Sequence, residues 1–180
     1  MMTETARRYG GSLYELASEE GRTDEVLAQL TEVLALMKEN PRYEKLLSEP
    51  SIPKGERVSL LDQAFGSSLW PYLLNFLKIL CENGTMGSLK GCAQEYRRRF
   101  NEDNGIVEVC AVTAVELKPA LKDALQAKLQ SVLGKTVELS CRVDPACMGG
   151  VLLELPGRQL DGTVKHRLDA LSASLKAAAL

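Results

Sequence analysis

The first hundred residues carry apolar side chains at the spacing of short α-helices. In the opening segment Tyr9, Leu13 and Leu16 recur at i, i+4 and i+7, with Ala6 and Ala17 beside them, which predicts an amphipathic helix. Glycine, asparagine and proline interrupt the pattern repeatedly and predict where helices end. These interruptions are Gly21, Asn40-Pro41, Pro50, Pro53, Gly66, Asn83-Gly84 and Asn104-Gly105. The pattern therefore predicts six helices in residues 1–104.

The last two of these helices have the broadest apolar faces. The fifth is predicted from Leu69, Leu73, Phe76, Leu77 and Leu80. The sixth is predicted from Met86, Leu89, Ala93, Tyr96 and Phe100. A stripe of this width has to be buried against neighbouring elements, so the six helices are expected to form a bundle.

Beyond Gly105 the period of the pattern changes from that of a helix to that of a strand. Three strands are expected from their apolar, β-branched or alternating composition: Ile106–Thr113, Val137–Val143 and Val151–Leu155. In the second, Val137, Leu139, Cys141 and Val143 should share one buried face. Two further helices are indicated, one from Pro119 to Gly134 and one along Val164, Leu168, Leu171 and Leu175. The fold class is therefore α+β: an N-terminal six-helix bundle, residues 1–104, followed by a small mixed α/β domain, residues 105–180.

Composition and charge narrow the function classes. The 180 residues are 45% hydrophobic and 26% charged, as in an ordinary globular protein that can bury a core. The formal net charge of −2 argues against a broad nucleic-acid surface, which needs clustered lysine and arginine. No apolar run approaches the roughly 20 residues that cross a bilayer, and the first residues lack the apolar core of a signal peptide. We expect a soluble protein that works where it is synthesised.

Candidate catalytic chemistry is sparse. The single histidine, His166, lies off the stripe of the last helix and is expected to be exposed. The five cysteines match no zinc-binding spacing, and buried free thiols are the favoured interpretation. Phosphate-binding loops of the Walker or dinucleotide type are missing, as is a nucleophile elbow. We expect no catalytic residue, no cofactor and no metal.

Two local features leave alternatives open. Arg97-Arg98-Arg99 is the only basic run, and a solvated helix face is favoured over an acidic partner helix or RNA. Gly10-Gly11-Ser12 places small residues inside the first helix, where glycine costs roughly 0.5–1 kcal/mol relative to alanine. Such residues permit close helix packing within the bundle, or they form one wall of a groove for a helix of another protein.

Four ordered motifs resemble the delta subunit of F-type ATP synthases, a family that includes the mitochondrial oligomycin-sensitivity-conferring protein. The motifs are Ala6–Ala17 in the first helix, Asn75–Gly84 in the fifth, the Val143–Val151 turn and strand, and Asp161–Val164 before the closing leucines. Each is weak alone, but together they span the chain in the family's order. The chain departs from the pattern at Thr85, where the family usually has arginine, and at Gly10, Ser12 and Thr163.

The resemblance implies a non-catalytic connector of the peripheral stalk. In this family the helical bundle binds the N-terminal helix of an alpha subunit in a groove between its first and fifth helices. The C-terminal part engages the C-terminal region of the b subunits, so that the catalytic head does not turn with the rotor during proton-driven ATP synthesis. The matching groove positions, expected to bind the partner, are Tyr9, Ser12, Leu13, Asn75 and Ile79.

The expected location is peripheral, on the cytoplasmic face of a bacterial cell membrane, with membrane attachment only through the complex and no nucleic-acid partner. Two alternatives come from other function classes. One is a helical RNA-binding or transcription adaptor, which the charge balance disfavours. The other is a small enzyme, which would need a site around His166 or a cysteine.

Overall fold

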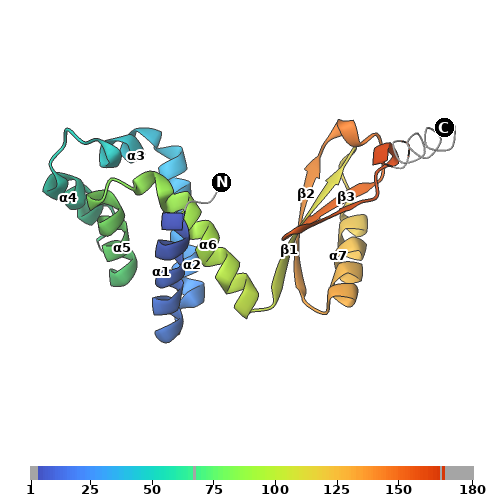
Figure 1. The fold of residues 1–180 in the computed structure, drawn as a ribbon, viewed down its shortest axis with the longest axis horizontal. Helices are drawn as coiled ribbons and strands as arrows, with labels where there is room; N and C mark the ends of the chain where they lie inside the picture. Colours follow the sequence, from blue (N-terminus) through green and yellow to red (C-terminus); the bar gives the residue numbers. More distant parts are fainter. Residues whose placement is uncertain (1–3, 67, 167, 169–180) are drawn as a thin grey trace, which may run out of the picture. The chain divides into compact units, whose positions relative to one another are not determined.

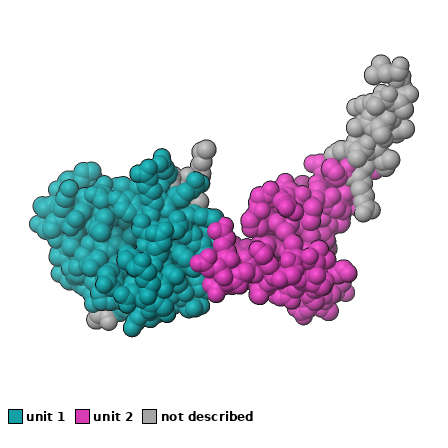
Figure 2. Space-filling view, turned by 60° about the horizontal axis from the view of Figure 1, so that its bottom comes forward, with its two compact units in different colours: residues 1–100 teal, residues 101–180 magenta. Residues whose placement is uncertain are grey.

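A computed structural model describes residues 4–66, 68–166 and 168 of the chain. The chain divides into two compact units, Met1–Phe100 and Asn101–Leu180 (Figure 2). The first unit is helical and the second is built on a small mixed sheet (Figure 1). The predicted α+β class, helical part first, is therefore confirmed.

The helices of the first unit follow the predicted breaks closely. They are α1 (Glu4–Glu19), α2 (Thr23–Glu39), α3 (Pro41–Ser48), α4 (Lys54–Phe65), α5 (Pro71–Glu82), the short 3-10 helix η1 (Met86–Ser88) and α6 (Leu89–Asp103). Prolines begin α3 and α5, where the missing N–H costs no helical hydrogen bond. The predicted sixth helix is divided, because its first residues form η1 before the α-helical turns start at Leu89.

The buried face of α1 contains only some of the residues in the predicted apolar pattern. Of the apolar positions in that pattern, Ala6, Leu13 and Ala17 are buried, whereas Tyr9 is only partly buried and Leu16 is exposed. The residues that α1 does bury are mostly small: Ala6, Gly10, Gly11, Leu13, Tyr14 and Ala17. Small side chains let the helix approach its neighbour closely, so this face is buried by close backbone packing rather than by large apolar side chains.

That neighbour is α6. The Cβ of Ala6 lies 2.9 Å from the position that a Cβ would take on Gly91, and the rings of Tyr14 and Tyr96 meet edge to face with centroids 5.2 Å apart. A Cβ on Gly10 would lie within 3.0 Å of the backbone of Cys92. The two helices therefore touch along their small residues, and this contact is one side of the bundle core.

The second unit is a four-stranded sheet with one helix against it. Its elements are β1 (Ile106–Thr113), α7 (Pro119–Leu133), β2 (Thr136–Val143), the 3-10 helix η2 (Pro145–Cys147), β3 (Val151–Leu155) and β4 (Arg158–Asp161). The strand order is β2-β1-β3-β4; β1 and β2 are parallel, and the other neighbours are antiparallel. The strand β4 was not predicted, because Arg158–Asp161 is short and exposed at every position. The predicted last helix falls largely on residues outside those described.

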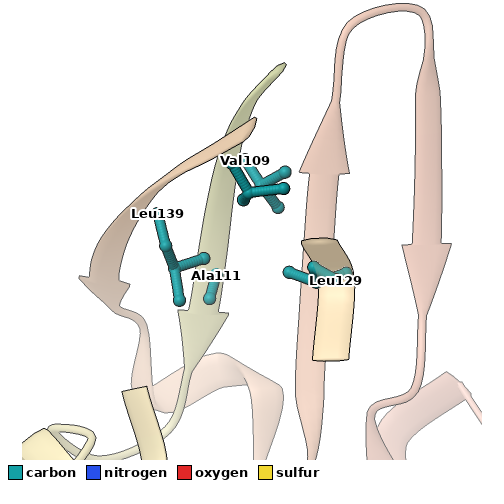
Figure 3. Close-up of a cluster of buried hydrophobic side chains, with 5 residues drawn as sticks. Val109, Ala111, Leu129 and Leu139 are labelled. Atoms are coloured by element: carbon teal, nitrogen blue, oxygen red, sulfur yellow. The ribbon is translucent and has the colours of Figure 1, made fainter. Parts of the chain in front are cut away.

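The core of this unit lies between α7 and one face of the sheet. Val109 and Ala111 of β1 and Leu139 of β2 point toward Leu129 of α7 (Figure 3). The predicted buried face of β2 is correct for Val137 and Leu139 but wrong for Cys141 and Val143, which are exposed. The helix residues that pack on this core are Leu125, Leu129 and Leu133. The first turn of α7 does not cover the sheet, since Leu121 is itself 57% exposed.

Candidate functional site

The candidate site consists of the exposed faces of α1 and α5. On α5, Tyr72, Asn75 and Ile79 lie at i, i+3 and i+7, and therefore on one face. Tyr72 is 49% exposed and Ile79 45%, which is high for side chains of this size in a folded bundle. On α1, Ser12 is exposed and Tyr9 half-buried. The structure therefore presents four of the five predicted site residues at the surface.

The fifth predicted residue, Leu13, points inward. Only 2% of its surface is exposed, so its side chain belongs to the bundle core. It lies next to Ser12 in sequence, but the turn of the helix between them points Leu13 into the core and leaves Ser12 exposed. Leu13 can fix the position of the exposed face from beneath, but it offers no surface to a partner.

A hydrogen bond joins the two helices at one end of the site. The Nδ2 amide of Asn83, the residue that follows α5, donates to the hydroxyl oxygen of Tyr9 over 3.3 Å. Next to it, Tyr9 and Ser12 line a hollow of about 470 Å³ together with Glu4, Thr5 and Arg8. The tyrosine therefore contributes to the hollow while its hydroxyl is held by the end of α5. Asn83 was part of the fifth-helix motif but was not predicted as a site residue.

The two glycines of α1 do not belong to this face. Gly10 meets the backbone of Cys92, and Gly11 lies beneath the guanidinium of Arg99, whose Cζ would be 2.8 Å from a Cβ. Both neighbours are on α6. Of the two interpretations of Gly10-Gly11-Ser12, packing within the bundle therefore holds for Gly10 and Gly11. Only Ser12 of this run faces outward.

The basic run on α6 is compensated by carboxylates. Arg98 Nη2 lies 2.6 Å from Glu95 Oε1, and Arg99 bridges Glu95 at 3.2 Å and Glu15 of α1 at 2.7 Å. The side chain of Glu95 is fully buried, and hydrogen bonds from Arg98 and then Arg99 hold its pKa below the usual value. The expectation that this run forms a simple solvated face is therefore wrong for Arg99, which ties α6 to α1, whereas Arg98 is exposed and pairs with Glu95 on its own helix.

The other candidate chemical groups are dispersed. His166 is exposed, as predicted, with its Nδ1 3.9 Å from Asp161 Oδ2. The thiols of Cys81, Cys92 and Cys147 are buried, and burial raises the pKa of the Cys92 thiol to about 11. The buried-thiol interpretation is wrong for Cys141, which is exposed. In the described part of the chain, no three histidine, cysteine or acidic side chains form a group that could hold a metal ion.

Two of the sequence motifs meet in the second unit. The Oδ1 of Asp144 accepts a 2.9 Å hydrogen bond from the backbone N–H of Ala146, which starts η2. A Cβ on Gly150, where φ is +81°, would collide with the carbonyl oxygen of Gly162. Gly150 is therefore required by the close approach of the segment that leads into Thr163, whose side chain is buried. These motif residues support the fold rather than a reaction.

Comparison with known proteins identifies the family. The family model described as ATP synthase delta (OSCP) subunit matches residues 5–175. The chain belongs to this family. Relatives named ATP synthase subunit delta match at nearly full length: that of Clostridioides difficile is 30% identical over 176 residues, 97% of each chain, and that of Moorella thermoacetica is 32% identical over 173 residues, 96% of this chain and 97% of its own.

The fold of this delta-family chain is also similar to that of a chain in a solved structure. A chain in the cryo-EM structure of the Toxoplasma gondii mitochondrial ATP synthase hexamer matches with a TM-score of 0.74 and 21% identity. The match covers 96% of this chain and 98% of that one. Helical part and mixed sheet are thus shared along the whole length.

Proposed function

We propose that this chain is the connector of the peripheral stalk of an F-type ATP synthase. It links the alpha/beta catalytic head to the b subunits, so that the head does not rotate with the rotor. The observation that carries this proposal is the match to the delta family over residues 5–175, together with relatives of the same name at nearly full length. Members of this family are structural subunits of the complex. The chain acts by binding and performs no reaction of its own.

The face formed by α1 and α5 is proposed to bind the N-terminal helix of the alpha subunit. Ile79 and Tyr72 supply exposed apolar surface, and Asn75 between them supplies an amide that can donate and accept hydrogen bonds. Ser12 is small and exposed, so a helix can approach α1 closely there. An amphipathic helix laid into such a surface would bury its apolar side chains against α5 and turn its polar face to water.

The second unit is proposed to bind the C-terminal region of the b subunits. It exposes several large apolar side chains, of which Val115, Val132 and Met148 are exposed by 73%, 70% and 71%. Single exposed apolar side chains are common on protein surfaces, so the assignment of this partner is supported by the family rather than by these residues. With one partner for each unit, residues 1–104 and 105–180 would carry the two ends of the connection.

The complex is proposed to hold this chain at the cytoplasmic face of a bacterial cell membrane. None of the helices in the described part of the chain is both long and apolar enough to cross a bilayer. Contact with the membrane would therefore be made through other subunits. The RNA-binding alternative gains no support from the basic run, because Arg98 pairs with Glu95 and Arg99 with both Glu95 and Glu15.

Calorimetric titration of the full-length chain with the N-terminal peptide of the alpha subunit from the same genome tests the helical surface. We expect Ile79→Ala to weaken binding by about 1–3 kcal/mol, since truncation of a central apolar contact typically has that effect. Leu36→Ala is the matched control, because Leu36 on α2 is similarly exposed, at 40%, but lies outside the site. Equal affinities for the two variants would refute the assignment of the surface, and a peptide that fails to bind the unaltered chain would refute the role.

A further inference from the structure

A second hollow of the first unit lies outside the site described above. It has a volume of about 400 Å³, within the range of small-molecule sites. Its wall comes from α2, α3, η1 and the start of α6. The lining residues are Leu34, Met37, Lys38, Glu44, Met86, Gly87, Leu89 and Lys90. Tyr9, Ser12, Asn75 and Ile79 do not contribute to it.

The lining of the hollow is partly apolar and also carries more positive than negative side chains. Met37, Met86 and Leu89 are buried, and they form the apolar part together with the half-buried Leu34. Lys38 and Lys90 are exposed, and in the described part of the chain neither ammonium group forms an ion pair. Glu44 is the one carboxylate in the lining, and it too takes part in none of these pairs. Two cations against one anion leave the lining with a net positive charge.

We propose that this hollow binds a small amphipathic anion, a medium-chain fatty acid being the simplest example. The alkyl chain would leave water for the apolar lining, in which Leu34 is half-buried and Met37, Met86 and Leu89 are buried, and the transfer of each methylene out of water is favourable. The carboxylate would lie between Lys38 and Lys90, which have no competing acidic partner within ion-pair distance. Charge complementarity selects an anion over a neutral amphiphile of the same length, because a neutral headgroup gains nothing from the two ammonium groups.

Gly87 provides a way to close the hollow without disturbing the fold. A Cβ built on this residue meets nothing within 4 Å, and its φ lies outside the left-handed region. A larger side chain can therefore be placed there and would occupy the space that the ligand needs. Gly55, on α4, has the same two properties but does not line the hollow, so it is the matched control position.

Methionine methyl NMR of the full-length chain reports on the hollow directly. The chain has five methionines, of which Met37 and Met86 line the hollow, whereas Met148 lies in the second unit. The probe is decanoate, kept well below the concentration at which it forms micelles. We expect saturable shifts of the Met37 and Met86 methyl signals and an unchanged Met148 signal. Octanoate should bind about fourfold more weakly for each methylene removed.

The variants decide the proposal. Gly87→Phe should abolish the decanoate-induced shifts of the Met37 and Met86 methyl signals. Gly55→Phe should leave these shifts as they are in the unaltered chain. The double variant Lys38→Ala/Lys90→Ala should weaken decanoate binding by roughly three- to tenfold and leave decanol unaffected. Equal binding of decanol and decanoate to the unaltered chain overturns the assignment to an anion. Retained binding in Gly87→Phe, or a Met148 shift that follows the other two, overturns the site itself.

Discussion

Replacing Gly10 by alanine tests whether the α1–α6 contact is as close as the structure has it. The new Cβ would lie within 3.0 Å of the Cys92 carbonyl oxygen and about as near to the Cα and carbonyl carbon of the same residue. All three are backbone atoms, so no side-chain rotation can relieve the collision. One of the two helices has to move, and the neighbouring contacts of Ala6 with Gly91 and of Tyr14 with Tyr96 would loosen with it.

Two opposing effects set the size of the change. Alanine favours the helix by about 1 kcal/mol relative to glycine in a helix interior. Forcing an extra methyl group into a packed contact typically costs 1–3 kcal/mol, and a contact with rigid backbone belongs to the upper part of that range. We therefore expect Gly10→Ala to lower the free energy of unfolding of the first unit by about 1–2 kcal/mol. Gly55→Ala, where a Cβ meets nothing, should leave it unchanged or raise it by up to about 1 kcal/mol.

Urea unfolding followed by tryptophan fluorescence measures this difference. Trp70 is the only tryptophan and is buried in the first unit, so its signal reports on that unit alone. The prediction concerns the sign as well as the size, because the same chemical change has opposite effects at the two positions. A Gly10→Ala variant that is as stable as the unaltered chain, or more stable, would refute the close α1–α6 contact.

Two further predictions concern buried charges in the same unit. Arg57 is buried on α4, and its Nη1 donates to the carbonyl oxygens of Leu47 and Cys81, near the ends of α3 and α5. Arg57→Met should lower the free energy of unfolding in urea by about 1–3 kcal/mol, and an unchanged midpoint would contradict this role. The pKa of Glu95 is lower in the folded chain than its unfolded value near 4.5, so the ionised carboxylate stabilises the fold at pH values above 4.5. This stabilisation is lost as the pH falls from 4.5 through the lower, folded-state pKa. Glu95→Gln should therefore unfold with a weaker dependence on pH between about 5 and 3; an unaltered pH profile would show that the carboxylate contributes nothing.

The helices could be predicted from the sequence because their pattern is local. In α6, Leu89, Ala93 and Tyr96 recur at helical spacing, and all three are buried as that spacing requires. The strand β4 has no such pattern, since Arg158–Asp161 is exposed throughout and depends on its pairing with β3. This segment is a strand because it pairs with β3, and its own residues do not predict it.

The candidate site stays a prediction, placed on α1 and α5 by family resemblance. Along α1, the large residues Tyr9 and Leu16 of the apolar pattern are not buried, whereas Leu13 is. The buried residues Ala6, Gly10, Leu13 and Ala17 are spaced by three or four positions, which is the helical period. The pairing of Arg98 and Arg99 with Glu95 was also readable, at i−3 and i−4. The bond from Arg99 to Glu15 joins residues 84 positions apart and follows only from the folded structure.

In the proposed role, this one chain joins the catalytic head to the stalk. The most direct test of this role is a bridging measurement, in which the water-soluble part of the b subunits is immobilised and the alpha/beta head is passed over it with and without this protein. We expect the head to be retained only when the unaltered chain is present, and retention to fall when Ile79→Ala replaces it. A head that binds equally well without the chain, or a chain that binds one partner but never both together, would contradict the role of connector.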